Sequence, residues 1–388
     1  MPSIRFRGFD DAWEQRKAKE LFVSTADKGY PELPVLSATQ DRGMIRRDEN
    51  SINIFHDKKN EDGYKRVLPG QFVIHLRSFQ GGFAHSAIEG ITSPAYTVFG
   101  FSEPEKHDSE YWKYVFTSKS FIQRLETVTY GIRDGRSISY EEFLTLGFVY
   151  PSKAEQTAIA RYLDKLSDLI TLHQRKFEKL TNVKKSILEK MFPRNGSSYP
   201  EIRFKGFTDP WEQRKFGEVA TFINGRAYSQ PELLSSGKYK VLRVGNFYTN
   251  DSWYYSDLEL GEKYYADYGD LLYTWSATFG PHIWLGDRVI YHYHIWKISL
   301  SDQLEKQFAV QLLEQDRANI LSSKNGSTMV HITKEGMEQK DVIIPPSTKE
   351  QQKIGAFFSQ LDDLITLHQR ELEKLQSIKK ALLEKMFV

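Results

Sequence analysis

The sequence predicts an α+β fold made by tandem duplication. In this fold an α/β globular domain followed by a long helix occurs twice, and the two long helices form an antiparallel coiled coil with pseudo-twofold symmetry. Two repeats predict it. The run DLITLHQRKFEKLTNVKKSILEKMF at 168–192 returns as DLITLHQRELEKLQSIKKALLEKMF at 363–387, and IRFRGFDDAWEQRK at 4–17 returns as IRFKGFTDPWEQRK at 202–215. Repeats of this length indicate duplicated domains rather than a solenoid.

Each copy of the longer repeat is expected to be a single helix. The repeated runs contain neither Gly nor Pro and are rich in Leu, Lys, Glu, Gln and Arg, which favour helix. Each helix begins after a Pro-Ser pair, where Ser152 or Ser347 can cap it and Glu155 or Glu350 supplies a capping-box carboxylate three residues on. A helix of roughly 40 residues is about 60 Å long. One small domain cannot bury such a helix, so we expect the two copies to pack on each other.

Apolar residues recur at seven-residue spacing along both helices, which is the pattern of a coiled coil. His173 and His368 occupy equivalent positions on this seam, where a polar side chain is unexpected. They either set the register or contact a partner, or they are ordinary hydrogen-bonded seam residues, and the second interpretation is favoured. The residues expected on the seam or at a partner contact are Leu166, Ile170, His173, Phe177, Leu180, Leu361, Ile365, His368, Leu372 and Leu375.

Five segments follow from the repeats. They are a first globular domain (1–150), a first long helix (151–192), a linker containing PRNGSSYP (193–201), a second globular domain (202–345) and a second long helix (346–388). Within the globular domains the pattern predicts strands at 71–76, 270–275 and 289–300, and short helices at 111–126 and 304–320.

The composition narrows the classes of protein. With 388 residues, 40% of them apolar, the chain can bury more than one core. Its 53 Lys and Arg against 51 Asp and Glu leave a net charge of +2, so a nucleic-acid partner requires a local basic surface. The absence of Cys excludes disulfides, thiolate metal sites and a Cys nucleophile. The polar N-terminus and the lack of an 18-residue apolar run predict neither a signal peptide nor a membrane span, and we expect a cytoplasmic protein.

Catalytic motifs are missing from the sequence. It contains no G-x-x-x-x-G-K-[ST] loop, no G-x-G-x-x-G, no H-E-x-x-H, no G-x-S-x-G, and no Asn- or Asp-Pro-Pro-aromatic signature of an adenine methyltransferase. His292 and His294 alternate on the expected strand 289–300, but no third ligand is evident, so a polar strand face is favoured over a metal site. We therefore expect no catalytic residue, no metal and no cofactor in this chain.

Residues suited to nucleic-acid contacts gather in expected loops. Arg can pair with guanine, Asn with adenine, and hydroxyl groups with phosphate, although a solvated surface charge is as good an interpretation for any single Arg. Most aromatic residues of the second domain are expected in its core, and TWSATFGPH at 274–282 is the loop best suited to approach a ligand. The candidate DNA-binding residues are Arg42, Arg46, Arg47, Arg77, Arg133, Arg136, Arg226, Arg243, Asn246, Tyr248, Trp275, Ser276, Thr278, His282, Lys324, Ser327, Thr328 and His331.

With these features in view, the whole chain resembles the specificity subunit of type I restriction–modification enzymes. The residues that carry the resemblance are the WEQRK segments at 13–17 and 211–215, the LDDLITLHQR helix at 361–370 with its first copy, the turns at Gly70 and Gly269, the TWSATFGP loop and GSTMVHITKEGMEQ at 326–339. One departure lies in the first domain, where IRDGRSI at 132–138 stands in place of GSTMVHI. The first domain is therefore expected to use different contacts.

The resemblance implies a division of labour. Residues 1–150 and 202–345 would be target-recognition domains, each reading one half of a split, asymmetric double-stranded DNA site. The long helices would fix the spacer and dock two methyltransferase subunits, and restriction and translocase subunits would join the assembly. S-adenosylmethionine, ATP and Mg would belong to those partner subunits, and no membrane is involved. The alternatives are a carbohydrate-binding protein on a helical stalk and a self-sufficient nuclease or methyltransferase with degenerate motifs.

Overall fold

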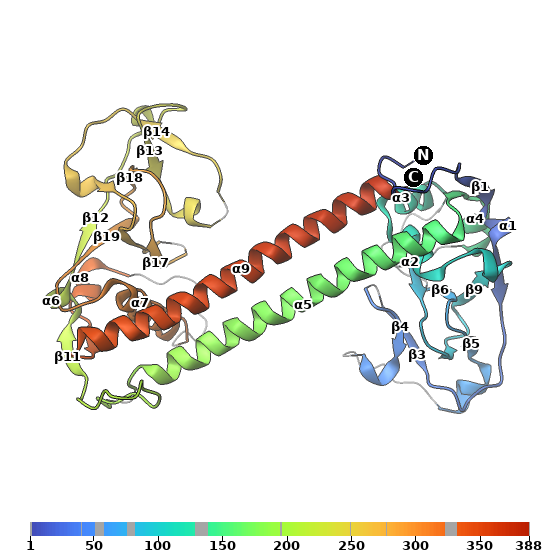
Figure 1. Ribbon diagram of the computed structural model, residues 1–388, viewed down its shortest axis with the longest axis horizontal. Coiled ribbons are helices and arrows are strands. Elements are labelled where there is room, and N and C mark those ends of the chain that lie inside the picture. The colour runs from blue at the N-terminus through green and yellow to red at the C-terminus, as the bar shows by residue number, and fades with distance from the viewer. Residues whose placement is uncertain are drawn as a thin grey trace. The chain divides into compact units, whose positions relative to one another are not determined.

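The computed structural model describes residues 2–39, 41–50, 58–75, 82–128, 139–194, 196–248, 250–276, 278–322 and 332–387. The chain forms two compact units. The first comprises Met1–Gln174 and Arg370–Val388, and the second comprises Arg175–Gln369. Two long helices, α5 (Lys153–Met191) and α9 (Thr348–Met386), each contribute one part to each unit (Figure 1).

The first unit has a four-stranded antiparallel sheet with the order β2-β9-β6-β7. Its strands are β2 (Phe22–Thr25), β9 (Thr97–Phe101), β6 (Phe72–Ile74) and β7 (Phe83–His85). Three two-stranded antiparallel pairs accompany it. They are β1 (Glu14–Lys17) with β10 (Gly147–Tyr150), β3 (Leu36–Thr39) with β4 (Gly43–Arg46), and β5 (Lys65–Val67) with β8 (Gly90–Thr92).

Short helices complete the first unit around an aromatic core. They are α1 (Ala18–Leu21), α2 (Ser109–Thr117), α3 (Lys119–Val128) and α4 (Tyr140–Thr145). Phe72, Phe99, Trp112 and Phe116 are buried within 2% exposure and touch ring to ring. The helical stretch expected at 111–126 is present as α2 and α3, which are separated at Ser118, whose hydroxyl accepts a hydrogen bond from Phe121 N.

The second unit repeats this plan and adds a second sheet. Its first sheet has the order β12-β19-β16-β17 and is antiparallel. Its second has the order β14-β13-β18-β15, with β13 and β18 parallel. These strands are β12 (Ala220–Asn224), β19 (Ile295–Leu300), β16 (Leu271–Thr274), β17 (Gly280–Ile283), β14 (Tyr254–Ser256), β13 (Tyr239–Leu242), β18 (Val289–Tyr291) and β15 (Tyr265–Ala266).

Three helices and one strand pair complete the second unit. They are α6 (Phe216–Val219), α7 (Lys306–Ser322), α8 (Lys334–Glu338) and β11 (Glu212–Lys215) paired with β20 (Asp341–Ile344). The expected strand 289–300 is wrong as a single element. It is β18 and β19 in different sheets, separated by a turn in which Ile295 N donates to His292 O.

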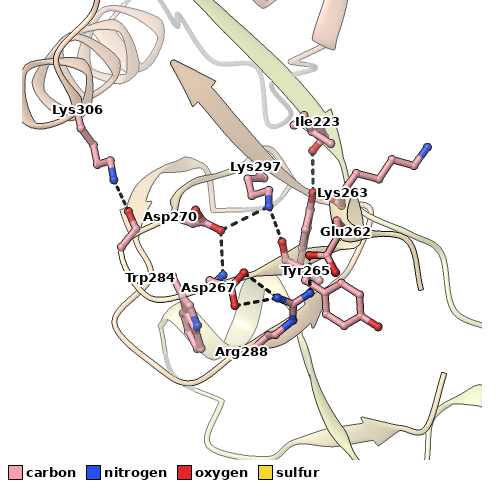
Figure 2. A network of polar contacts seen from close by, with 12 residues as sticks. Ile223, Glu262, Lys263, Tyr265, Asp267, Asp270, Trp284, Arg288, Lys297 and Lys306 are labelled. Atoms are coloured by element: carbon pink, nitrogen blue, oxygen red, sulfur yellow. Dashed lines mark hydrogen bonds and ion pairs between the residues drawn. The ribbon is translucent and has the colours of Figure 1, made fainter. Parts of the chain in front are cut away.

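A polar network fixes the two sheets of the second unit relative to each other (Figure 2). Lys297 on β19 donates to Tyr265 O on β15 at 2.7 Å and lies 3.5 Å from the Asp270 carboxylate. Arg288 pairs with Glu262 at 2.7 Å and with Asp267 at 3.3 Å, and its guanidinium lies over the Tyr265 ring at 4.2 Å. The Lys297 contact links the two sheets, whereas the Arg288 pairs lie beside β15 and β18 of the second sheet. These pairs are partly exposed and contribute little stability.

In each unit the start of one long helix packs beside the end of the other. In the first unit Leu163 and Leu166 of α5 share a core with Leu382 and Met386 of α9. In the second unit Leu188 of α5 shares a core with α9 residues near its start, including Phe358. The antiparallel coiled coil and the duplicated α+β fold are therefore confirmed. Of the seam residues expected from sequence, Leu166 and Leu372 are buried; the others, His173 and His368 included, are half-buried.

The short N-terminal repeat ties each unit to its helix. Arg5 donates to both carboxylate oxygens of Glu155 at 2.7 Å, and Arg203 donates to both oxygens of Glu350 at 2.7 and 2.8 Å. Glu155 and Glu350 were expected as capping-box carboxylates, but both oxygens of each are taken by a guanidinium instead. The sequence alone could not show that Arg5 and Arg203 come back to the helix starts.

Candidate nucleic-acid interface

The β16–β17 hairpin of the second unit carries the TWSATFG loop, of which Ala277 lies outside the described residues. Thr274 and Gly280 pair at the base of the loop. A Cβ at Gly280 would lie 3.2 Å from Arg317 Cδ, so the strand passes close to α7. Ser276 is half-buried and Thr278 is exposed, which leaves a hydroxyl-bearing loop open to a ligand.

Three polar side chains meet beside this hairpin, and we call them the Tyr248 cluster: Tyr248, Thr274 and His282. The Tyr248 hydroxyl lies 3.1 Å from His282 Nε2 and 3.3 Å from Thr274 Oγ1. Phe247 stacks on the His282 ring at 4.1 Å. Burial, and then the positive charge of Arg317, lowers the pKa of His282 to about 4. The imidazole is therefore neutral near pH 7.

Trp275 is anchored rather than free. Its indole Nε1 donates to Tyr293 O at 2.9 Å, and its ring stacks on Trp296 at 5.8 Å and meets His294 edge-on at 4.9 Å. This partly buried ring extends the aromatic core of the second unit.

His292 and His294 lie in the turn between β18 and β19, not on a strand face, which corrects the expectation from sequence. Burial lowers the pKa of His292 to about 4, with smaller contributions from His294 and Arg243. Among the residues that the structure describes, no group of three His, Asp or Glu side chains is placed to hold a metal ion.

The candidate Arg and Asn residues of the second unit divide into two kinds. Arg226 pairs with Glu232 at 2.5 Å, whereas Arg243 lies over the Tyr254 ring at 4.3 Å and its buried Nε finds no partner within the described part of the chain. Asn246 accepts from Arg243 N and donates to two loop carbonyls, those of Asn250 and Ser252. The oxygen and the NH2 group of the Asn246 amide thus bond to the loop, so we no longer expect Asn246 to contact adenine.

In the first unit three candidates lie on or next to the β3–β4 hairpin. Arg42 and Arg46 are exposed, and Arg42 N donates to Thr39 Oγ1 at 3.1 Å. Arg47 is half-buried, and its Nε and Nη1 find no partner in the described ranges. A cavity of about 930 Å³ opens beside the hairpin and is lined by Arg42, Lys113 and several carboxylates.

Seven candidates lie outside the described residues: Arg77, Arg133, Arg136, Lys324, Ser327, Thr328 and His331. Thr274 and Arg317 were missed by the sequence reasoning. Thr274 was quoted only as the start of a loop, and nothing in the sequence places Arg317 of α7 near β17.

A second kind of surface lies on the long helices, where the sequence predicts apolar positions beyond those that the helix pair buries. Six aliphatic side chains of the long helices are 36–52% exposed. They are Leu169, Leu172, Val183, Leu364, Leu367 and Ile378. Each of these positions is apolar in both copies of the repeat. Such residues have no role in the seam, and exposed apolar rows of this kind mark protein contacts.

Comparison with known proteins gives one consistent family. The family model for the type I restriction modification DNA specificity domain matches residues 208–377. The putative type I restriction enzyme MjaX specificity subunit of Methanocaldococcus jannaschii is 21% identical, over 96% of this chain and 92% of that protein.

Solved structures share the fold. The S subunit of a type I restriction–modification system from M. genitalium aligns with a TM-score of 0.59 at 16% identity, over 100% of this chain and 99% of that one. A chain from a structure on complex assembly and conformational transition of the type I R-M system aligns with a TM-score of 0.54 at 14% identity, over 97% and 98%.

Two divergent α/β units on a pair of repeated helices are therefore the fold that this chain shares with the S subunit from M. genitalium. Residues 208–377 match the type I restriction modification DNA specificity domain, and the chain is similar over 96% of its length to a type I specificity subunit. Among the described residues, no helix combines the length and apolar character needed to cross a membrane.

Proposed function

We propose that the chain reads a bipartite, asymmetric duplex DNA site, one half with each globular domain. The observation that carries this proposal is the contrast between what is repeated and what is not. The WEQRK segments are identical and the helix segments 168–192 and 363–387 are closely similar, whereas residues 18–150 and 216–345 diverge strongly. Two readers of one plan with different loops would recognise two different half-sites.

The long helices would serve as a ruler and as a docking surface. The apolar seam of each long helix packs against the other long helix. Leu169 and Leu364, at equivalent positions of the repeat, nevertheless remain 43% and 45% exposed. Equivalent surfaces suit two copies of one partner, and we assign them to two methyltransferase subunits. Restriction and translocase subunits would join this assembly. S-adenosylmethionine, ATP and Mg would be bound by those partners.

The test is a genome-wide map of methylated adenines in cells that hold this chain with its methyltransferase, compared with cells that lack the chain. A single split motif with a fixed gap is expected only when the chain is present. Exchange of residues 216–345 for those of another specificity subunit should then replace one half-site and leave the other. Unchanged methylation in both comparisons would overturn the proposal.

A further inference from the structure

Tyr248 is a partly exposed residue whose hydroxyl contacts two other side chains of the second unit. Tyr248 is 42% exposed, and its phenolic oxygen lies within hydrogen-bond distance of His282 and Thr274. We infer that Tyr248 is a specificity-determining residue of the second globular domain and presents an acceptor oxygen to an amino group on a base edge. This inference rests on the proposed function.

The position of this oxygen is fixed before any ligand arrives. Tyr248 follows a short 3-10 helix at Val244–Phe247, Thr274 ends β16, and His282 lies on β17. Three separate segments therefore hold one hydroxyl. Phe247 stacks on His282 with ring planes 17° apart, which limits rotation of the imidazole. A side chain that is already ordered loses little entropy on binding, so its contact contributes more to affinity.

Counting protons shows which way the Tyr248 hydroxyl points. Thr274 Oγ1 donates to Gly280 O at 3.3 Å, which leaves the Thr274 oxygen as an acceptor toward Tyr248 and toward His282 Nε2, which lies 3.4 Å away. His282 is neutral and carries one N–H. With that proton on Nδ1, Nε2 accepts from Tyr248. With it on Nε2, the imidazole donates to Tyr248 or to Thr274, and Tyr248 donates to Thr274.

In both arrangements the Tyr248 proton is used inside the cluster. The phenolic oxygen keeps a lone pair for a ligand and has no proton to offer it. A phosphate oxygen is itself an acceptor, so the DNA backbone does not match this oxygen. In the major groove the matching donors are N6 of adenine and N4 of cytosine, whereas guanine and thymine present acceptor oxygens there. Tyr248 would therefore favour A or C over G or T at one position.

His282 acts through Tyr248 and is a positioning residue. Replacement by Phe keeps an aromatic ring against Phe247 but removes the nitrogen that orients the hydroxyl. Replacement by Gln supplies an amide that can donate or accept at a similar reach. The two variants thus separate loss of the hydrogen bond from loss of the ring.

The experiment uses the full chain assembled with its methyltransferase subunits. Methylation of a duplex library that is randomised across the motif is followed by sequencing. Tyr248→Phe should lower the preference for A or C over G or T by about two- to tenfold, the value of one net hydrogen bond, at a single position of the second domain's half-site. His282→Phe should give a similar loss, and His282→Gln should retain most of the preference.

Tyr268→Phe is the matched control, because Tyr268 lies in the same unit and is 74% exposed. It should leave the motif unchanged. Several outcomes would overturn the inference: an unchanged motif in Tyr248→Phe, a relaxed preference for G or T, or a rate loss that is uniform over all sequences, as a phosphate contact would give. If exchange of residues 216–345 also leaves both half-sites unchanged, the proposed function itself fails.

Discussion

Arg203 donates two charge-assisted hydrogen bonds to the Glu350 carboxylate, from Nε at 2.7 Å and from Nη2 at 2.8 Å. The Glu350 side chain is 1% exposed. Trp211 Nε1 adds a third donor at 3.3 Å. The partner pair in the first unit, Arg5 and Glu155, has the two Arg contacts. There Trp13 Nε1 is buried and finds no partner among the described residues.

Glu350→Gln should destabilise the second unit by about 3 kcal/mol, because it leaves the Arg203 guanidinium near a buried neutral amide. Urea unfolding of the free chain measures this. Glu212→Gln, which removes an exposed pair with Arg214, is the control and should cost less than about 1 kcal/mol. Glu155→Gln should cost somewhat less than Glu350→Gln because its carboxylate lacks the Trp donor. Equal, small costs for the buried and exposed variants would contradict the role assigned to this pair.

The two Arg–Glu pairs also show which features of the fold can be predicted from the sequence and which cannot. The repeats located Arg203 and Glu350, and heptad spacing with no Gly or Pro located both long helices. The Arg–Glu pairing is a contact over 147 residues of chain, and no local pattern encodes it. The same holds for the Tyr248 cluster, because hydrogen bonding among Tyr248, Thr274 and His282 depends on how three segments pack.

The misjudged strand at 289–300 has a different cause. Apolar and aromatic residues alternate across the whole run, as one strand requires. The chain nevertheless changes sheets within it: Ile290 pairs in parallel with Val241, and Trp296 pairs with Asn224 in the other sheet. Alternation of side chains indicates an extended strand with two different faces, but it does not indicate which neighbouring strand pairs with it.

The lowered pKa of His282 predicts a pH-dependent stability. Its pKa is 6.5 in ordinary surroundings and about 4 in the folded chain. Between these values the unfolded chain binds a proton that the folded chain does not, so stability falls as the pH drops from 6.5 to 4. This group should contribute about 2–3 kcal/mol to that fall.

Urea unfolding of the wild type and of His282→Gln at pH 7 and pH 4.5 tests this. The difference in unfolding free energy between the two pH values should shrink in the variant. His292→Gln is a matched comparison, because His292 also has a pKa of about 4 and should account for a separate part of the slope. Parallel pH curves for the wild type and His282→Gln would show that His282 titrates normally.

The exposed leucines of α9 offer a test of the docking surface. Leu364→Lys with Leu367→Lys keeps strong helix formers in place and removes apolar side chains that are 45% and 52% exposed. The free chain should unfold within about 0.5 kcal/mol of the wild type. The methyltransferase should no longer bind to this surface of α9. Native mass spectrometry of the copurified complex should then show at most one bound methyltransferase copy. Gln360→Lys, an exposed polar position on the same helix, should leave both copies bound.

The ruler role makes a prediction about spacing alone. Both long helices pass from one unit to the other, at Gln174–Arg175 and at Gln369–Arg370. Seven residues inserted at both points add one heptad, about 10 Å of helix, and keep the apolar seam in phase. At 3.4 Å per base pair the gap in the methylated motif should lengthen by about three base pairs while both half-sites stay the same. Insertion of seven residues at only one point breaks the match between the two helices and should lower methylation instead. A changed half-site sequence, or an unchanged gap in an active complex, would show that the helices do not set the spacing.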